Sequence, residues 1–278
     1  MSKFQLILIV ASVVLVAIIY SLPKVVVDNE EDAGGRQANA VDQELDMEAG
    51  LNMPAHMSDF TEEEKAEIAK LRNEVSSSAI ASEINNAANQ LAVLYQKYSR
   101  FDSAAHYAGI LANNQPTDAN IKQAAFLYFD AYSFSVAPEK VRSNADRASD
   151  LLGKVLEKNP EDLEAKTRLG LILVNSPQPM QGIMMVREVL EQEPENEFAL
   201  FNMGLLSIES RQFPRAVEYF ERYQAVNPEN EEGQLYLAIS YLESGNNAKA
   251  LETFSRLRER VSDPEMIRTI DQYTERLK

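Results

Sequence analysis

Proline returns every 34 residues in the C-terminal half of this chain, and this spacing limits what the chain can fold into. Pro160, Pro194 and Pro228 each follow an Asn or a Glu and precede a Glu. The residue before a proline is driven out of the α region, so each of these positions should end a helix. A fixed period of this size indicates a series of equal structural units.

Other positions keep the same period. A large apolar residue followed by a small one, a second small residue, and a large apolar or aromatic residue all recur at this step. They are Leu169-Gly170, Met203-Gly204 and Leu237-Ala238; Gly182, Ala216 and Ala250; and Val186, Phe220 and Phe254. This pattern resembles the tetratricopeptide repeat. The resemblance covers residues 85–278 and implies a right-handed α-solenoid of helix pairs that binds other proteins.

The residues support the same architecture without the resemblance. Within each unit, apolar residues recur at spacings of three and four, which is typical of amphipathic helices. Breakers such as Pro177, Pro214 and Gly245 divide each unit into two helices. Glycine inside a helix costs about 1 kcal/mol relative to alanine, so Gly170 and Gly204 suggest a close helix crossing. We therefore predict an all-α solenoid whose units cannot bury their apolar faces alone.

The solenoid is expected to occupy residues 60–278. A capping box at Thr61 and Glu64 predicts a first helix over residues 61–77. Repeats follow at about 85–118, 119–162, 163–196, 197–230 and 231–262, and a capping helix at 264–277. The second repeat is ten residues longer than the period, which predicts an extended first helix or a longer turn near Pro138.

The N-terminal segment is strongly apolar. Residues 4–22 contain no charge, and nineteen helical residues reach about 28 Å, close to the roughly 30 Å hydrocarbon core. A cleaved signal peptide is the alternative, but an A-x-A-type site is missing. We predict an uncleaved, single-pass transmembrane signal anchor. Its short N-terminal tail favours an N-in orientation, which in a Gram-negative cell places the repeats in the periplasm, held at the inner membrane.

Residues 23–59 are predicted to form a disordered acidic linker. Between Asp28 and Glu64 there are twelve acidic residues and one basic residue, Arg36. Such a run is typical of a solvated tether, and recruitment of a basic partner is the alternative. The chain's formal net charge of −16 argues against nucleic-acid binding.

No catalytic or cofactor-binding motif is present. The chain has no cysteine, no phosphate-binding glycine loop and no zinc or EF-hand motif. His56 lies in the predicted linker, and we interpret His106 as a packed or exposed side chain rather than a general base. We expect neither enzymatic activity nor a cofactor nor a metal.

An apolar stripe on the first helix of successive repeats is the one candidate binding surface. It consists of Leu171, Val174, Phe198, Phe201, Leu205, Ile208, Leu235, Ile239 and Leu242. By the resemblance, this stripe lines the concave groove in which partners bind. Alternatively, the capping helix or the helix at 61–77 covers it. A clamp for a peptide carboxylate would need several basic residues. The first repeat offers one, Lys97, together with Asn86 and Asn89.

The chain looks like bacterial inner-membrane repeat proteins that serve envelope assembly. The expected function is therefore that of a membrane-anchored protein–protein interaction module, an adaptor or chaperone-like factor that binds a peptide or helix in its groove. One branch of these proteins holds apocytochrome segments during cytochrome c maturation, which is an alternative. A homo-oligomeric scaffold with a self-occupied groove is another.

Overall fold

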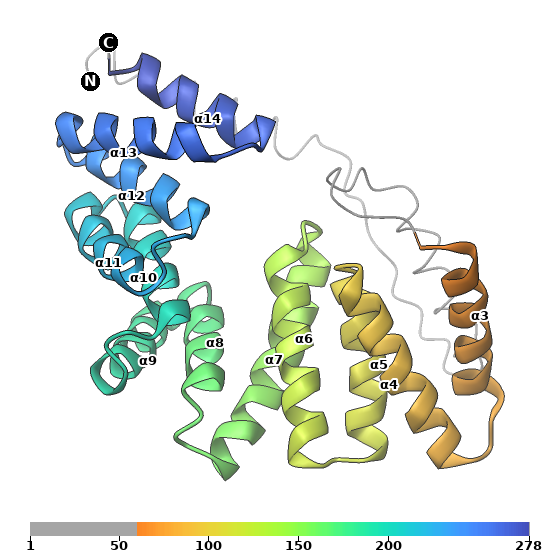
Figure 1. Cartoon of the computed structure of the whole chain (residues 1–278). Helices are drawn as coiled ribbons and strands as arrows, with labels where there is room; N and C mark the ends of the chain where they lie inside the picture. Colours follow the sequence, from red (N-terminus) through yellow and green to blue (C-terminus); the bar gives the residue numbers. More distant parts are fainter. Residues whose placement is uncertain (1–59, 278) are drawn as a thin grey trace, which may run out of the picture. The chain divides into compact units, whose positions relative to one another are not determined.

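The computed structural model describes residues 60–277 (Figure 1). The predicted anchor at residues 4–22 and the predicted linker at 23–59 lie outside the described residues. The described part consists of twelve α-helices and contains no strand, which confirms the all-α class. None of the helices in this part is long and apolar enough to cross a membrane.

Each helix packs against the next one along the chain. The helices are α3 (Glu62–Ser77), α4 (Ala81–Lys97), α5 (Phe101–Asn114), α6 (Asp118–Phe134), α7 (Pro138–Lys158), α8 (Leu163–Val174), α9 (Pro179–Gln192), α10 (Glu197–Glu209), α11 (Phe213–Val226), α12 (Glu231–Glu243), α13 (Asn247–Arg260) and α14 (Pro264–Glu275). In addition, α8 contacts both α6 and α10, and α10 contacts α12. Helix pairs are thus stacked so that their first helices form one row, as in an α-solenoid.

The first and last helices begin at the predicted capping residues. Thr61 accepts a hydrogen bond from the Glu64 amide, and the Glu64 side chain accepts one from the Thr61 amide. Asp263 caps α14 by accepting from the amides of Glu265 and Met266. The α4–α5 pair begins at Ala81, four residues before the repeat start expected from the sequence.

The ten extra residues of the second repeat lengthen its helices. α6 has 17 residues and α7 has 21, whereas α8 has 12 and α9 has 14. Only residues 135–137 separate α6 from α7. The sequence predicted an extended first helix or a longer turn. The first helix, α6, is longer, but most of the added length is in the second helix, α7, which neither alternative gave.

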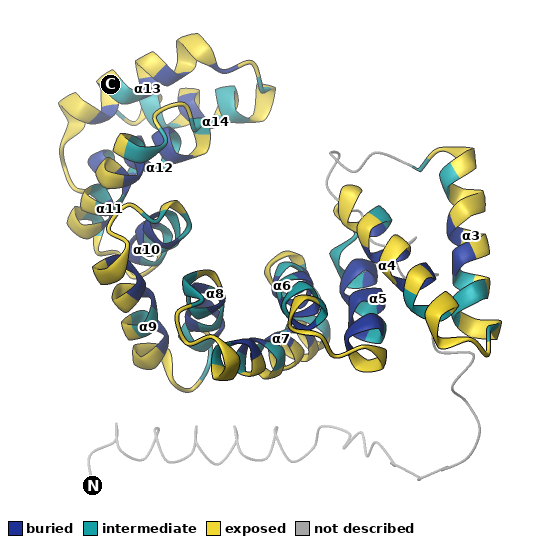
Figure 2. Cartoon of the chain, turned by 60° about the horizontal axis from the view of Figure 1, so that its bottom comes forward, coloured by how far each residue is buried: buried dark blue, intermediate teal, exposed yellow. Residues whose placement is uncertain are grey.

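Small residues mark the places where the two helices of a unit cross closely. A Cβ atom on Gly170 would lie 2.8 Å from a methyl group of Val186 and 2.9 Å from the carbonyl oxygen of Gly182. A Cβ atom on Gly204 would lie 2.6 Å from the ring of Phe220. The glycine column of the sequence therefore exists because a larger side chain has no room there. Figure 2 shows the buried residues where neighbouring helices meet.

Helix α3 is attached to α4 by the side chain of Glu64. This carboxylate accepts hydrogen bonds from Lys97 Nζ at 2.9 Å and from the Tyr98 hydroxyl at 2.5 Å. These two bonds, with the one from the Thr61 amide, lower the pKa of Glu64 to about 2. The carboxylate that caps α3 thus also joins it to the first repeat.

The attachment of α3 should weaken in acid. Because the folded-state pKa of Glu64 is depressed, its contribution is present above the ordinary glutamate value of about 4.3, and it is lost as the pH falls through about 2. Above pH 5, amides of α3 should be better protected from hydrogen exchange in the wild type than in Glu64→Gln. This difference should narrow from pH 5 toward pH 2. A difference that does not depend on pH would contradict this account.

Candidate functional site

A groove of about 1000 Å³ lies between α6, α7, α8 and α10. Its apolar lining includes Phe129 and Tyr132 of α6, Val141 of α7, Leu171 of α8 and Leu205 of α10. The charged side chains that line it are Arg142, Asp146 and Glu209. The groove therefore spans helices from three successive units and presents apolar side chains with polar groups among them.

A second pocket, of about 480 Å³, adjoins this groove. Phe129, Ser133 and Asn202 line both spaces. The rest of its lining is Asp130 and Phe134 of α6, Glu197, Phe198 and Phe201 of α10, Tyr223 of α11, and Asn230 and Glu232 at the start of α12. A segment bound in the groove could extend into this pocket without leaving the surface.

The nine predicted groove residues fall into three groups. Leu171 and Leu205 line the large groove, and Phe198 and Phe201 line the smaller pocket. The other five are half-buried. Four of them pack against the C-terminal core, namely Ile208, Leu235, Ile239 and Leu242, and the fifth is Val174 on α8. The structure thus brings four of the nine residues to the two neighbouring cavities.

The stripe on α10 is half-buried, which lies between the open and the covered arrangement considered from the sequence. Its central residue, Phe201, packs among three aromatic rings. The ring centroids lie 5.2 Å from Tyr223, 5.8 Å from Phe220 and 5.8 Å from Tyr236. The helices considered as covers pack elsewhere in the series, α3 against α4 and α14 against α13. The partner helix α11 of the same repeat and α12 of the next repeat, rather than α3 or α14, bury one side of Phe201.

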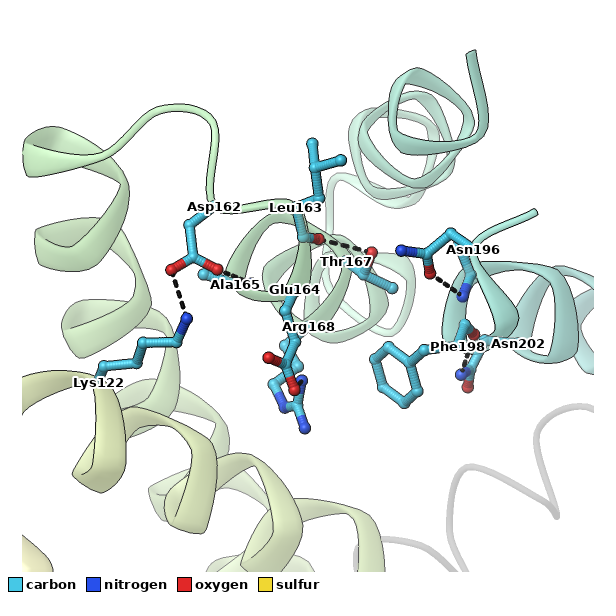
Figure 3. Close-up of polar contacts among 11 residues, drawn as sticks. Lys122, Asp162, Leu163, Glu164, Ala165, Thr167, Arg168, Asn196, Phe198 and Asn202 are labelled. Carbon is cyan, nitrogen blue, oxygen red and sulfur yellow. Dashed lines mark hydrogen bonds and ion pairs between the residues drawn. The ribbon is translucent and has the colours of Figure 1, made fainter. Parts of the chain in front are cut away.

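Arg168 of α8 connects the aromatic residues of α6 and α10. Its guanidinium lies 4.0 Å from the ring centroid of Phe126 and 4.8 Å from that of Phe198. Glu164, one turn earlier, accepts a hydrogen bond from Arg168 Nη1 at 2.7 Å. Figure 3 shows Arg168, Glu164 and Phe198 together. Through these cation–π contacts, Arg168 links α6 to α10.

The start of α8 is fixed by Asp162. Its carboxylate accepts from the Ala165 amide at 3.1 Å, which caps the helix, and pairs with Lys122 of α6 at 2.6 Å (Figure 3). A cap of this kind satisfies a backbone donor that the helix itself cannot. Because the same carboxylate reaches α6, capping and positioning of α8 against α6 depend on one side chain.

The sequence reasoning missed the contribution of α6 and of the turn after it. Phe134 and Val136 are 68% and 78% exposed, although both are large and apolar, and they line the pocket and the groove respectively. A signal was available, because Phe126, Phe129 and Tyr132 recur at a spacing of three.

Residues considered for other chemistry lie outside these cavities. Lys97, which a carboxylate clamp would need, is paired with Glu64 at 2.9 Å. The ring of His106 packs edge-on against its neighbour Tyr107 on α5, and His56 lies outside the described residues. Among residues 60–277, no cluster of histidine and acidic side chains could hold a metal ion.

Residues 207–269 match the family model of the tetratricopeptide repeat. This segment of the chain is similar to tetratricopeptide repeats. The match spans α11, α12 and α13, where two of the 34-residue units meet.

Solved structures of MamA are similar to this chain. The crystal structure of MamA is 15% identical, with a TM-score of 0.46, and covers 64% of this chain and 92% of its own. MamA 41-end from Desulfovibrio magneticus RS-1 is 16% identical, with a TM-score of 0.47, and covers 63% and 93%. MamA AMB-1 is 19% identical, with a TM-score of 0.44, and covers 66% and 95%. No curated protein matches the sequence.

The surroundings of Phe201 predict that its replacement by aspartate destabilises the C-terminal repeats. An aspartate among three rings buries an unpaired carboxylate, which should cost several kcal/mol. Thermal unfolding followed by circular dichroism should show a lower Tm, and hydrogen exchange should place the loss in α10 to α12. Val136→Asp is the control, because Val136 is 78% exposed and should leave the Tm unchanged. Equal melting of both variants would show that Phe201 is not held by these rings.

Proposed function

We propose that this chain is a membrane-anchored adaptor that holds a segment of a partner polypeptide in the groove between α6, α7, α8 and α10. One observation carries the proposal. The groove measures about 1000 Å³, and a large apolar side chain, Val136, stands 78% exposed at its lining. Exposed apolar side chains beside a cavity mark interaction sites more often than isolated ones do.

The size and lining of the groove suit a polypeptide. Ligand pockets usually measure about 300–1000 Å³ and combine apolar walls with a few polar groups. This groove is at the upper limit of that range and runs across α6, α8 and α10, which come from successive repeats. The polar side chains among its apolar residues, such as Asn175 and Asn202, offer donors and acceptors to a bound backbone.

We also propose that the protein acts by binding rather than by catalysis. Of the described residues that line the groove and the pocket, none is a histidine, lysine or cysteine. The serines there, such as Ser133, therefore have no imidazole beside them that could act as a base. This composition supports a surface that holds a partner.

The predicted anchor at residues 4–22 sets the proposed location. It places the protein in the bacterial inner membrane with the repeats on the periplasmic side, where an adaptor could serve envelope assembly. The acidic residues 23–59 would act as a tether between the membrane and the repeats. An apocytochrome segment is one polypeptide that such a groove could hold.

The proposal can be tested by chemical crosslinking and pull-down from native membranes. Val136→Asp should weaken capture of the partner by about tenfold or more, as loss of an apolar anchor does. Met184→Asp is the matched control, since Met184 is 64% exposed on α9 and does not line the groove. Unchanged capture by Val136→Asp would contradict the proposal. Recovery of the chain alone, crosslinked to itself, would favour the homo-oligomeric scaffold.

The proposed topology predicts the behaviour of a C-terminal fusion. A reporter that is active only outside the cytoplasm should be active when it is fused after Lys278, because the short N-terminal tail stays inside. A protease added to intact spheroplasts should cleave the tether at residues 23–59. A cytoplasmic reporter that is active in the same position, with a protected tether, would reverse the orientation.

A further inference from the structure

The pocket beside the groove combines aromatic rings with carboxylates. Phe129, Phe134, Phe198, Phe201 and Tyr223 supply the rings. The carboxylates are Asp130, Glu197 and Glu232, and the described lining contains no arginine, lysine or histidine. A cavity with this lining is complementary to a cation that also has a flat or apolar surface.

The carboxylate of Asp130 makes no hydrogen bond and no salt bridge within residues 60–277. It lies one turn before the end of α6, and burial raises the pKa of Asp130, against the charge of Arg168. A partly buried carboxylate that lacks an ion pair is unfavourable, and an added cation would remove that cost. No role in helix capping accounts for this side chain.

Glu197 and Glu232 have a simpler explanation, because both lie in the first turn of a helix. Carboxylates are favourable there in any protein. Their charges nevertheless act on the pocket: burial, followed by the charges of Glu197 and Glu232, raises the pKa of Tyr223. Glu197 accepts a hydrogen bond only from a neutral amide, that of Asn227 at 3.0 Å. Their charge is therefore not balanced by a cation in the described part of the chain.

The same aromatic cluster already holds one guanidinium. Arg168 stacks 4.8 Å from the ring centroid of Phe198, which lines the pocket. Glu164 balances the charge of Arg168 at 2.7 Å. The charge of Arg168 also acts on Asp130, but burial outweighs it, and the pKa of Asp130 is still raised.

We propose that this pocket binds an arginine side chain of the polypeptide that occupies the groove. This inference rests on the proposed function. The pocket and the groove share Phe129, Ser133 and Asn202, so a side chain of a bound segment can enter the pocket. Arginine fits better than lysine, because its planar guanidinium stacks on rings and bonds carboxylates with two donors at once.

The probe is a random dodecapeptide display library, panned against the full-length chain in a mild detergent. Peptides selected on the wild type should be enriched in arginine next to apolar residues. One selected peptide is then synthesised with arginine and with citrulline, which has nearly the same shape but no charge. Replacement by citrulline should weaken binding to the wild type by about tenfold, as loss of a desolvated cation–π contact with its ion pairs does.

Variants of the chain locate the effect. Against Asp130→Asn combined with Glu232→Gln, the arginine and citrulline peptides should bind with nearly equal affinity. Glu218→Gln is the matched control, since Glu218 is an exposed carboxylate on α11 that does not line the pocket. Like the wild type, this variant should bind the arginine peptide more tightly than the citrulline peptide. Circular dichroism of each variant should match that of the wild type.

The outcomes separate the two proposals. If selected peptides lose binding with Val136→Asp but bind equally with citrulline, the groove holds a peptide and the arginine pocket is wrong. If replacement of arginine by citrulline lowers the affinity for the double variant as much as for the wild type, the arginine-pocket proposal is also wrong. If no peptide depends on Val136, the proposed function fails, and the inference fails with it.

Discussion

Close contact between the two helices of a unit is the constraint on which the rest of this structure depends. At Gly170, one added carbon would meet both the backbone of α9 and the side chain of Val186. At the equivalent Gly204, it would meet the ring of Phe220. Each pair is therefore fixed locally, and the next pair packs against a surface that is already formed. The row of first helices, which carries the binding surface, follows from this local stacking.

The irregular repeat forms much of the site. Its longer helices, α6 and α7, carry Phe129, Tyr132 and Val141 to the groove. Phe134 at the end of α6 and Val136 in the turn after it are exposed. A regular repeat would have no residues at this position. Regular spacing therefore stabilises the solenoid, while the departure from it leaves large apolar side chains exposed. Phe134 stacks on Phe101 with 4.8 Å between the ring centroids, whereas Val136 is 78% exposed and is the side chain that best indicates binding.

The helix pairs and both capped ends could be predicted from the sequence, because period, caps and breakers are local signals. The stripe on α10 was predicted as a face, but its half burial depends on rings from other helices, Phe220, Tyr223 and Tyr236. Asp130 could not be singled out at all. Its significance depends on the surroundings that α8 and α10 bring to it, and no spacing along the chain encodes them. The aromatic residues of α6, which recur at a spacing of three, are a local signal for this face of the helix.

Electrostatics and aromatic packing have separate roles in the proposed site. The pair of Lys122 with Asp162 positions α8 against α6, while Glu164 pairs with Arg168 on α8 itself. What remains at the pocket is the negative charge of Asp130 and the two glutamates. Such a field speeds the approach of a basic segment, and added salt screens it. The carboxylates would also hold the guanidinium once it is bound, and stacking on the rings, which is less sensitive to salt, would add to that attraction.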